Sequence, residues 1–235
     1  MRILNIQPYI RYEDKDILVC YKPAGLAVQS ARMGQMDLES LLKNYEVSKN
    51  PGQMPFVGVV HRLDQPVEGL LVFGKNRKAA AKLNQSLAQE GLGKKYLAVV
   101  HGTVNEKGRL EDYLKKDARQ NASFVVEEGT PQSKKAVLRY APLKIKDSMT
   151  LVEIEIDTGR HHQIRVQMSH AGMPLAGDHK YGKEDDVDTV ALCAHKIAFP
   201  HPVTGKKMKF EIRPQGVVFQ SFLQMKHKKE ETLSY

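Results

Sequence analysis

The chain has 235 residues, of which 41% are hydrophobic, and its formal net charge is +9. This composition is typical of a folded protein, and no apolar run approaches the roughly 20 residues that cross a bilayer. The first residues lack the continuous apolar core of a signal peptide, so we expect a cytoplasmic protein. The basic charge favours a polyanion, such as nucleic acid or an anionic membrane, over a small neutral substrate.

The first half of the chain is predicted to alternate short strands with two helices. Leu38, Leu41 and Leu42 recur at helical spacing in the first helix, and Asn76 can cap the second, which Gly91 ends. The predicted elements are a strand, turn and strand over 16–30, a helix over 37–46, a loop over 48–55, strands over 56–61 and 69–75, and a helix over 76–92.

The second half is predicted to be rich in strands. Its elements are strands over 94–102, 123–127, 135–143 and 149–157, a turn and a helix that ends at Gly172, two strands over 190–212 joined by a turn, a helix from 216, and a loose tail over 226–235. Because strands and helices do not alternate regularly, a doubly wound parallel sheet is disfavoured. We predict one α+β domain over 1–235, with a mixed, largely antiparallel central sheet flanked by helices.

Several common catalytic signatures are absent from the sequence. It has no phosphate-binding G-x-x-x-x-G-K-[ST], no G-x-G-x-x-G, no H-E-x-x-H and no G-x-S-x-G. Cys20 and Cys193 lie far apart and outside any C-x-x-C pair, which favours two free thiols. Nothing here predicts a nucleotide, redox or zinc-ribbon cofactor.

The nine histidines could in principle build a metal site. The adjacent pair His161 and His162 falls in the predicted helix, where neighbours point about 100° apart and cannot easily face one ion. No acidic residue lies at ligand spacing within that helix. We therefore expect no metal, and a metal-dependent hydrolase is the weakest of the functional hypotheses.

Three polar groups of residues interrupt the apolar framework. His61-Arg62-Leu63-Asp64 lies between two predicted buried strands, Lys94-Lys95-Tyr96 opens a strand, and a run over 159–165 stands at the turn before a helix. Taken singly, each has an ordinary structural explanation, such as an exposed ion pair of little energetic worth.

Taken together, four ordered motifs resemble those of the RluA-type pseudouridine synthases. They read HRLDQPVEGLLVFGK, KKYLAVVHG, TGRHHQIRVQMSHAGMPLAGDHKYG and LCAHKIAFPHPVTGK, and LVCYKPAGLAVQ resembles the family's opening strand pair. The resemblance runs over about 16–222. It implies the pseudouridine synthase fold with a central RNA-binding cleft, and isomerisation of uridine in RNA without cofactor or metal.

The resemblance also implies roles for particular residues. The family's catalytic aspartate falls on Asp64, its base-contacting tyrosine on Tyr96, and the basic partner of the aspartate on Arg165. Arg62 matches the arginine that helps to hold the target base out of the helix. The further residues expected to contact RNA are His61, Lys94, Lys95, Arg160 and His161.

The chemistry of the reaction agrees with these residue types. The base leaves the sugar, turns and reattaches through carbon, so nothing is oxidised or carried away. Asp64 could attack the sugar or the base, or remove a sugar proton, and all three routes use the ionised carboxylate that a nearby cation such as Arg165 favours. Tyr96 offers a ring face for stacking and a hydroxyl for proton relay. A paired base must be flipped out, and Arg62 is long enough to fill the gap.

The sequence departs from the family pattern after Asp64. Where the family has Arg-x-Thr-Ser-Gly, this chain has Gln65-Pro66-Val67-Glu68 before Gly69, which predicts an acid near a cleft that binds a polyanion. His161 replaces a usual threonine, and His179 a usual proline.

Because the resemblance to the catalytic domain begins near residue 16, we expect no N-terminal RNA-binding module of the kind that many relatives carry. The expected partner is therefore a stem-loop of ribosomal or transfer RNA, bound by a monomer with no obligate protein partner and no membrane. The alternative is a non-catalytic RNA-binding protein on the same scaffold, which would not need Asp64, Tyr96 and Arg165 together.

Overall fold

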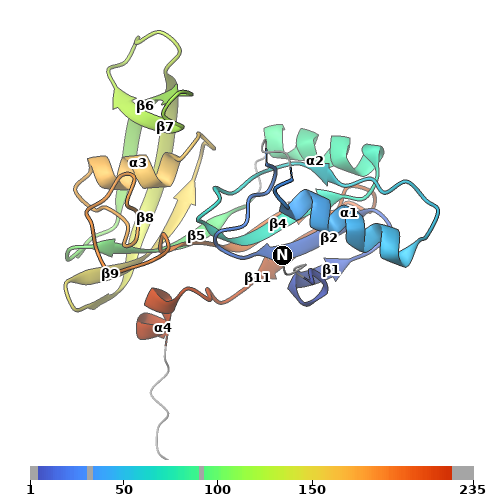
Figure 1. Ribbon diagram of the computed structural model, residues 1–235. Helices are drawn as coiled ribbons and strands as arrows, with labels where there is room; N and C mark the ends of the chain where they lie inside the picture. Colours follow the sequence, from blue (N-terminus) through green and yellow to red (C-terminus); the bar gives the residue numbers. More distant parts are fainter. Residues whose placement is uncertain (1–4, 31–33, 90–92, 224–235) are drawn as a thin grey trace, which may run out of the picture.

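A computed structural model describes residues 5–30, 34–89 and 93–223 (Figure 1). The predicted helix end at Gly91 and the predicted tail over 226–235 lie outside these residues. Within them, a 3-10 helix at Gln7–Tyr9 precedes β1, and four α-helices accompany the strands. The α-helices are α1 (Leu38–Lys49), α2 (Arg77–Gln89), α3 (Gln163–His170) and α4 (Val217–Leu223). None of the described helices is long and apolar enough to cross a membrane.

Eleven described strands form a single sheet. Their bounds are β1 (Ile10–Glu13), β2 (Ile17–Lys22), β3 (Gly58–Val59), β4 (Glu68–Gly74), β5 (Lys95–His101), β6 (Gly108–Asp117), β7 (Ala122–Val126), β8 (Lys134–Lys146), β9 (Met149–Ile156), β10 (Leu192–Pro200) and β11 (Lys207–Glu211). The main order is β1-β2-β4-β10-β5-β9-β8-β6-β7, with β3 on β4 and β11 on β10. The β4–β10 pair is parallel and the other described pairs are antiparallel, which confirms the predicted fold class.

Alternate residues of the central strands face two different apolar cores, as the pleat of a strand requires. Leu18 of β2 packs in one core with Leu42 of α1, and Val19 packs in another with Leu83 of α2. Tyr96 of β5 belongs to the first core, which α3 also joins. Figure 1 shows α3 beside β6, β7 and β8 at one end of the sheet, and α1 and α2 near β2 and β4 at the other.

The caps of the helices follow from the sequence. Asp37 accepts the Ser40 N–H at 2.8 Å at the start of α1, and the side chain of Asn76 accepts the Ala79 N–H at 2.8 Å, as predicted for α2. After α3, Gly172 adopts a left-handed φ of 77°, and the Met173 N–H closes the turn onto the carbonyl of Met168 at 2.9 Å. The predicted end of this helix at Gly172 is thereby confirmed.

Three local predictions differ from the structure. The strand expected near residue 28 does not form, because the carbonyls of Ala27 and Val28 accept the first N–H groups of α1, from Leu38 and Glu39. The strand expected over 56–61 shortens to the two residues of β3. The long β6 was not predicted, since most of its side chains are exposed or half-buried and it lacks a continuous apolar face.

Candidate active site

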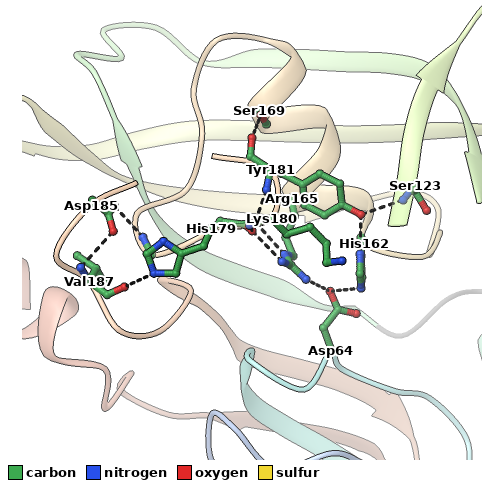
Figure 2. Close-up of polar contacts among 12 residues, drawn as sticks. Asp64, Ser123, His162, Arg165, Ser169, His179, Lys180, Tyr181, Asp185 and Val187 are labelled. Atoms are coloured by element: carbon green, nitrogen blue, oxygen red, sulfur yellow. Dashed lines mark hydrogen bonds and ion pairs between the residues drawn. The ribbon is translucent and has the colours of Figure 1, made fainter. Parts of the chain in front are cut away.

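Asp64 lies in the loop that joins β3 to β4 (Figure 2). The next residue, Gln65, anchors this loop to the end of β2: its carbonyl accepts the Gly25 N–H at 2.9 Å, and its side-chain amide donates to the Gly25 carbonyl at 3.0 Å. The ammonium of the fully buried Lys22 donates to the Gln65 carbonyl at 3.1 Å. Burial lowers the pKa of Lys22 to about 7, although the charge of Asp64 opposes that shift. The backbone beside Asp64 is therefore fixed independently of any substrate.

Arg165 of α3 connects Asp64 to a second, buried carboxylate. Its Nε and Nη2 donate to the two oxygens of Asp178 at 2.8 and 2.7 Å, and its Nη1 donates to Asp64 Oδ2 at 3.3 Å. The guanidinium also lies 5.1 Å from the centre of the Tyr181 ring. Burial alone would lower the pKa of Arg165, but Asp178 and Asp64 outweigh it and raise that pKa. The bidentate pair holds a permanent cation against the carboxylate of Asp64.

His162 approaches Asp64 from the turn before α3. Its Nε2 lies 3.6 Å from Asp64 Oδ2, and its Nδ1 lies 2.7 Å from the hydroxyl of Tyr181. Burial lowers the pKa of His162 to about 4, although Asp64 opposes the shift. Neither His162 nor Tyr181 was among the residues predicted for the site. The only signal for them was their place in the motifs HHQIR and GDHKYG.

The two adjacent histidines do not diverge as the helical prediction required. His161 and His162 both precede α3, and their rings stack with centroids 3.8 Å apart. His162 has a left-handed φ of 54°, which breaks the helical repeat between the two side chains. The rings therefore face one site together, and the argument from a 100° separation was wrong at this position.

Tyr96 stands on β5, across β10 from the strand that follows Asp64. Its side chain is buried, and burial together with the negative charge of Asp64 raises its pKa. The phenol therefore keeps its proton at neutral pH. The structure thus brings together Asp64, Tyr96 and Arg165, which are distant in the sequence.

These three residues line a cavity of about 550 Å³, a size suited to a small molecule or a single nucleotide. Charged and polar side chains share the rest of the lining with apolar ones, and Lys116 of β6 is a cation that the sequence did not suggest. The polar residues of the lining, besides the three above, are His61, Arg62, Lys94, Lys116, Arg160, His161, His162 and Gln163.

The residues expected to contact RNA differ in their exposure and in whether they line the cavity. Arg62 and Arg160 are exposed at the cavity, and Lys94 is half-buried there. Burial lowers the pKa of Lys94 to about 8. Lys95 instead pairs with Glu153 at 3.0 Å and does not line the cavity. The alternation of β5 explains this difference, since neighbouring residues point to opposite faces.

His61 also differs from expectation. Its ring is buried, and its Nε2 accepts the Val72 N–H at 3.1 Å. Burial lowers the pKa of this ring well below its usual value, so it is neutral. His61 lines the cavity, but its ring is hydrogen-bonded to β4. This contact holds the loop of Asp64 against that strand.

Glu68 corrects the expectation of an acid beside the cleft. Its carboxylate is buried at the start of β4 and does not line the cavity. It accepts a hydrogen bond from the hydroxyl of Tyr21 and the backbone N–H groups of Gln215 and Gly216, at 2.9 and 3.0 Å. The departure from the family pattern thus affects the framework and adds no negative charge to the cavity wall.

Among the described residues, Asp14, Asp16 and His201 have ligand atoms within 4.8 Å of one another. Their polar atoms already serve a turn. Asp14 Oδ1 accepts the N–H groups of Asp16 and Ile17, and its Oδ2 accepts from Tyr12 and meets His201 Nε2 at 3.0 Å. Both carboxylate oxygens of Asp14 are thereby engaged in hydrogen bonds at this turn.

Comparisons with known proteins agree with the geometry. A family model described as RNA pseudouridylate synthase matches residues 16–170. An RNA pseudouridine synthase of Bacillus subtilis, YlyB, is 38% identical over 208 residues, which cover 86% of this chain and 67% of that protein. Ribosomal large subunit pseudouridine synthase D of Pseudomonas aeruginosa is 35% identical, with 88% and 68% covered.

A solved structure, human RNA Pseudouridylate Synthase Domain Containing 4, has a TM-score of 0.76 at 21% identity, covering 92% of this chain and 93% of that one. This likeness shows the fold. The chain spans about two thirds of the length of the curated relatives above. Together the matched family model and the sequence identities show that the chain belongs to the RNA pseudouridine synthase family, isomerases of the RluA type that act on RNA.

Proposed function

We propose that this protein converts particular uridines of structured RNA to pseudouridine, with Asp64 as the catalytic carboxylate and the target base flipped into the cavity. The observation that carries the proposal is the position of Asp64. Its carboxylate is a quarter exposed at the cavity and is held there by Arg165. A pure RNA-binding protein has no use for a carboxylate fixed in this way at the centre of a cationic site.

The cavity contains a side chain that can act in each step of the isomerisation. The bond between the sugar C1′ and the base N1 breaks, the base turns, C5 bonds to C1′, and the proton leaving C5 is balanced by one gained at N1. Asp64 acts at the nucleotide, as nucleophile or as base. Tyr96, which keeps its phenolic proton, contacts the base and can relay a proton.

The rim of the cavity suits a flipped nucleotide. A base leaving an RNA helix must be unstacked, and a side chain can take its place. Arg62 is exposed, two residues from Asp64, and can enter the gap. Lys94, Lys116 and Arg160 supply positive charge for the flanking phosphates.

Several relatives bear the name of ribosomal large subunit pseudouridine synthases. We therefore propose a stem-loop of ribosomal RNA as the substrate, with the enzyme acting in the cytoplasm.

Replacing Asp64 tests this proposal. We expect Asp64→Asn to lower the rate of pseudouridine formation by at least about 10²-fold, because the reacting oxygen is lost, while thermal unfolding changes little. Asp147→Asn is the matched control, since Asp147 is an exposed aspartate in the β8–β9 turn. The measurement is pseudouridine mapping of RNA from cells that lack the protein and express either variant.

Two results would contradict the proposal. Full activity of Asp64→Asn would exclude the aspartate as the catalytic group. If no pseudouridine disappears when the protein is removed, the non-catalytic RNA-binding alternative gains support.

A further inference from the structure

The hydrogen bonds behind His162 favour one position for its ring proton. The backbone N–H of Ser123 lies 2.8 Å from the hydroxyl oxygen of Tyr181 and can only donate, so this oxygen accepts. The hydroxyl proton of Tyr181 is then free to donate to His162 Nδ1, 2.7 Å away. A neutral imidazole that accepts at Nδ1 carries its proton on Nε2. Figure 2 shows these contacts running from the backbone of Ser123 through Tyr181 and His162 to Asp64.

The protonated Nε2 faces the same oxygen of Asp64 as Arg165 does. In the part of the chain that the structure describes, the contacts of this carboxylate fall on Oδ2, at 3.3 Å from Arg165 Nη1 and 3.6 Å from His162 Nε2. The second distance exceeds a hydrogen bond, but catalytic contacts are often long before substrate binds. Among the described residues, no side-chain hydrogen bond engages Oδ1, whereas Oδ2 accepts one from Arg165.

We propose that His162 is a positioning residue: a neutral imidazole, fixed as the Nε2–H form by Tyr181 and Ser123, that holds Asp64 Oδ2 jointly with Arg165 and leaves Oδ1 as the oxygen that meets the nucleotide. This inference rests on the proposed function, since it assigns the reacting oxygen of the same catalytic carboxylate.

The surroundings of His162 favour the neutral ring. The side chain is buried, the cations Arg165 and Lys180 lower its pKa further, and only the negative charge of Asp64 acts in the opposite direction. Burial and the cations disfavour the imidazolium, so the ring stays neutral over the pH range in which the enzyme would work. A neutral donor can orient a carboxylate without adding a second full charge beside it.

The neighbouring histidine reinforces the same geometry. His161 Nδ1 lies 2.9 Å from the hydroxyl of Ser123, and its ring stacks on that of His162. Ser123 therefore contacts both Tyr181, through its backbone N–H, and His161, through its hydroxyl. Since Ser123 belongs to β7, a strand at the edge of the sheet holds the histidine pair in place.

Two substitutions of His162 separate donation from packing. His162→Phe keeps a ring that stacks on His161 but removes both nitrogens. His162→Gln can place its amide N–H₂ where Nε2 stood and so keeps a donor for Asp64. With ribosomal RNA from cells lacking the protein as probe, we expect His162→Phe to lower the single-turnover rate at least about tenfold, because a displaced carboxylate reacts slowly.

The dissociation constant for that RNA is expected to change less than about twofold, because the substitution leaves the phosphate-facing cations in place. His162→Gln is expected to react at least about threefold faster than His162→Phe. Equal rates of the two variants, or a change in RNA affinity alone, would overturn the positioning role. Should His162→Phe fail to fold, Tyr181→Phe, which keeps the ring under Arg165, is expected to lower the rate in the same way.

The tautomer itself is measured without any activity. Nitrogen-15 NMR of the histidine-labelled protein is expected to show His162 with an unprotonated Nδ1 and a protonated Nε2 from pH 6 to 8, and assignment follows from the spectrum of His162→Gln. An Nδ1–H form, or a doubly protonated ring, would overturn the inference. A wild-type protein that shows this tautomer but forms no pseudouridine would refute the proposed function and leave the tautomer established.

Discussion

At the scale of single residues, Arg165 binds two carboxylates, those of Asp178 and Asp64, which have different roles. Asp178 is 1% exposed and takes two of the guanidinium's hydrogen bonds, whereas Asp64 takes one and remains open to the cavity. Asp178 therefore orients the arginine, and the arginine orients Asp64. The motif in the sequence indicated Arg165 as the partner of Asp64, whereas Asp178, 114 positions further along the chain than Asp64, was marked only by its place in the motif GDHKYG and was given no role.

Lys94 gives the site a dependence on pH that can be measured. Its pKa is lowered to about 8, so its ammonium is charged below that pH and loses its charge as pH rises through it. We expect the dissociation constant for RNA to rise about tenfold between pH 7 and pH 9, because one charged contact with phosphate is lost. Filter binding over this range measures the effect.

Lys94→Met is expected to bind weakly and with little dependence on pH over the same range. Lys95→Met is the control, because hydrogen bonds to Glu155 and Glu153 raise the pKa of Lys95 and its ammonium lies outside the cavity. A wild-type affinity that stays constant from pH 7 to pH 9 would contradict the assignment of Lys94.

At the scale of elements, Glu68 ties the segment before α4 to the first residue of β4. Its carboxylate accepts from the N–H groups of Gln215 and Gly216, far away in sequence. The strand that follows the loop of Asp64 is therefore fixed from both sides of the sheet, by Lys22 at Gln65 and by this contact at Glu68.

Glu68→Gln tests this connection. An amide N–H₂ set against backbone donors leaves one of them unsatisfied, so we expect the free energy of unfolding to fall by about 1–3 kcal/mol. Urea unfolding measures the loss, and hydrogen exchange is expected to accelerate at Gln215 and Gly216. Glu106→Gln, at an exposed glutamate in the β5–β6 connection, should change neither. Unaltered exchange at both amides would show that the contact contributes nothing.

The elements that the sequence predicted well are those with a repeating apolar pattern or a clear cap. The helix from Leu38, the cap at Asn76 and the alternating strand over 149–157 belong to this group. The predictions that were wrong concern residues whose structure is set by backbone contacts or backbone conformation and not by an apolar repeat or a cap. The segment near residue 28 looks like a strand but gives its carbonyls to a helix, and His162 leaves the helical repeat through a backbone conformation that no pattern of polarity reveals.

At the scale of the whole molecule, the chain has a net charge of +9, but only a few of its described cations line the cavity. Four cations line the cavity and stay uncommitted to Asp64: Arg62, Lys94, Lys116 and Arg160. If each neutralises one phosphate, we expect log Kd to rise with log salt concentration with a slope of about 3. Lys116→Gln is expected to lower that slope by about 0.7 to 0.9, whereas Lys107→Gln, an exposed lysine outside the cavity, should leave it unchanged. A slope near zero would exclude binding through these phosphates.

The motifs predicted which residues form the site, but they did not predict the order of strands that brings these residues together. The sequence named Asp64, Tyr96 and Arg165, and the structure places all three on one cavity. The order of the strands, with β10 between β4 and β5, depends on pairings between residues 94 to 125 positions apart. Such pairings leave no local pattern, since any buried strand of suitable length could take the place.

The central position of β10 in the sheet has a consequence for folding while the chain is being synthesised. Gly69 of β4 packs so closely on Ala194 of β10 that an added Cβ would meet the Ala194 backbone nitrogen at 2.5 Å, and Ala194 is also paired with Tyr96. One residue thus sets the separation of the two halves of the catalytic centre. While a ribosome is still making the chain, β4 can pair with β2, but no described strand holds β4 in register with β5 until residue 194 has emerged. The candidate active site therefore assembles only after β10 has left the ribosome, although Asp64 and Tyr96 are made much earlier.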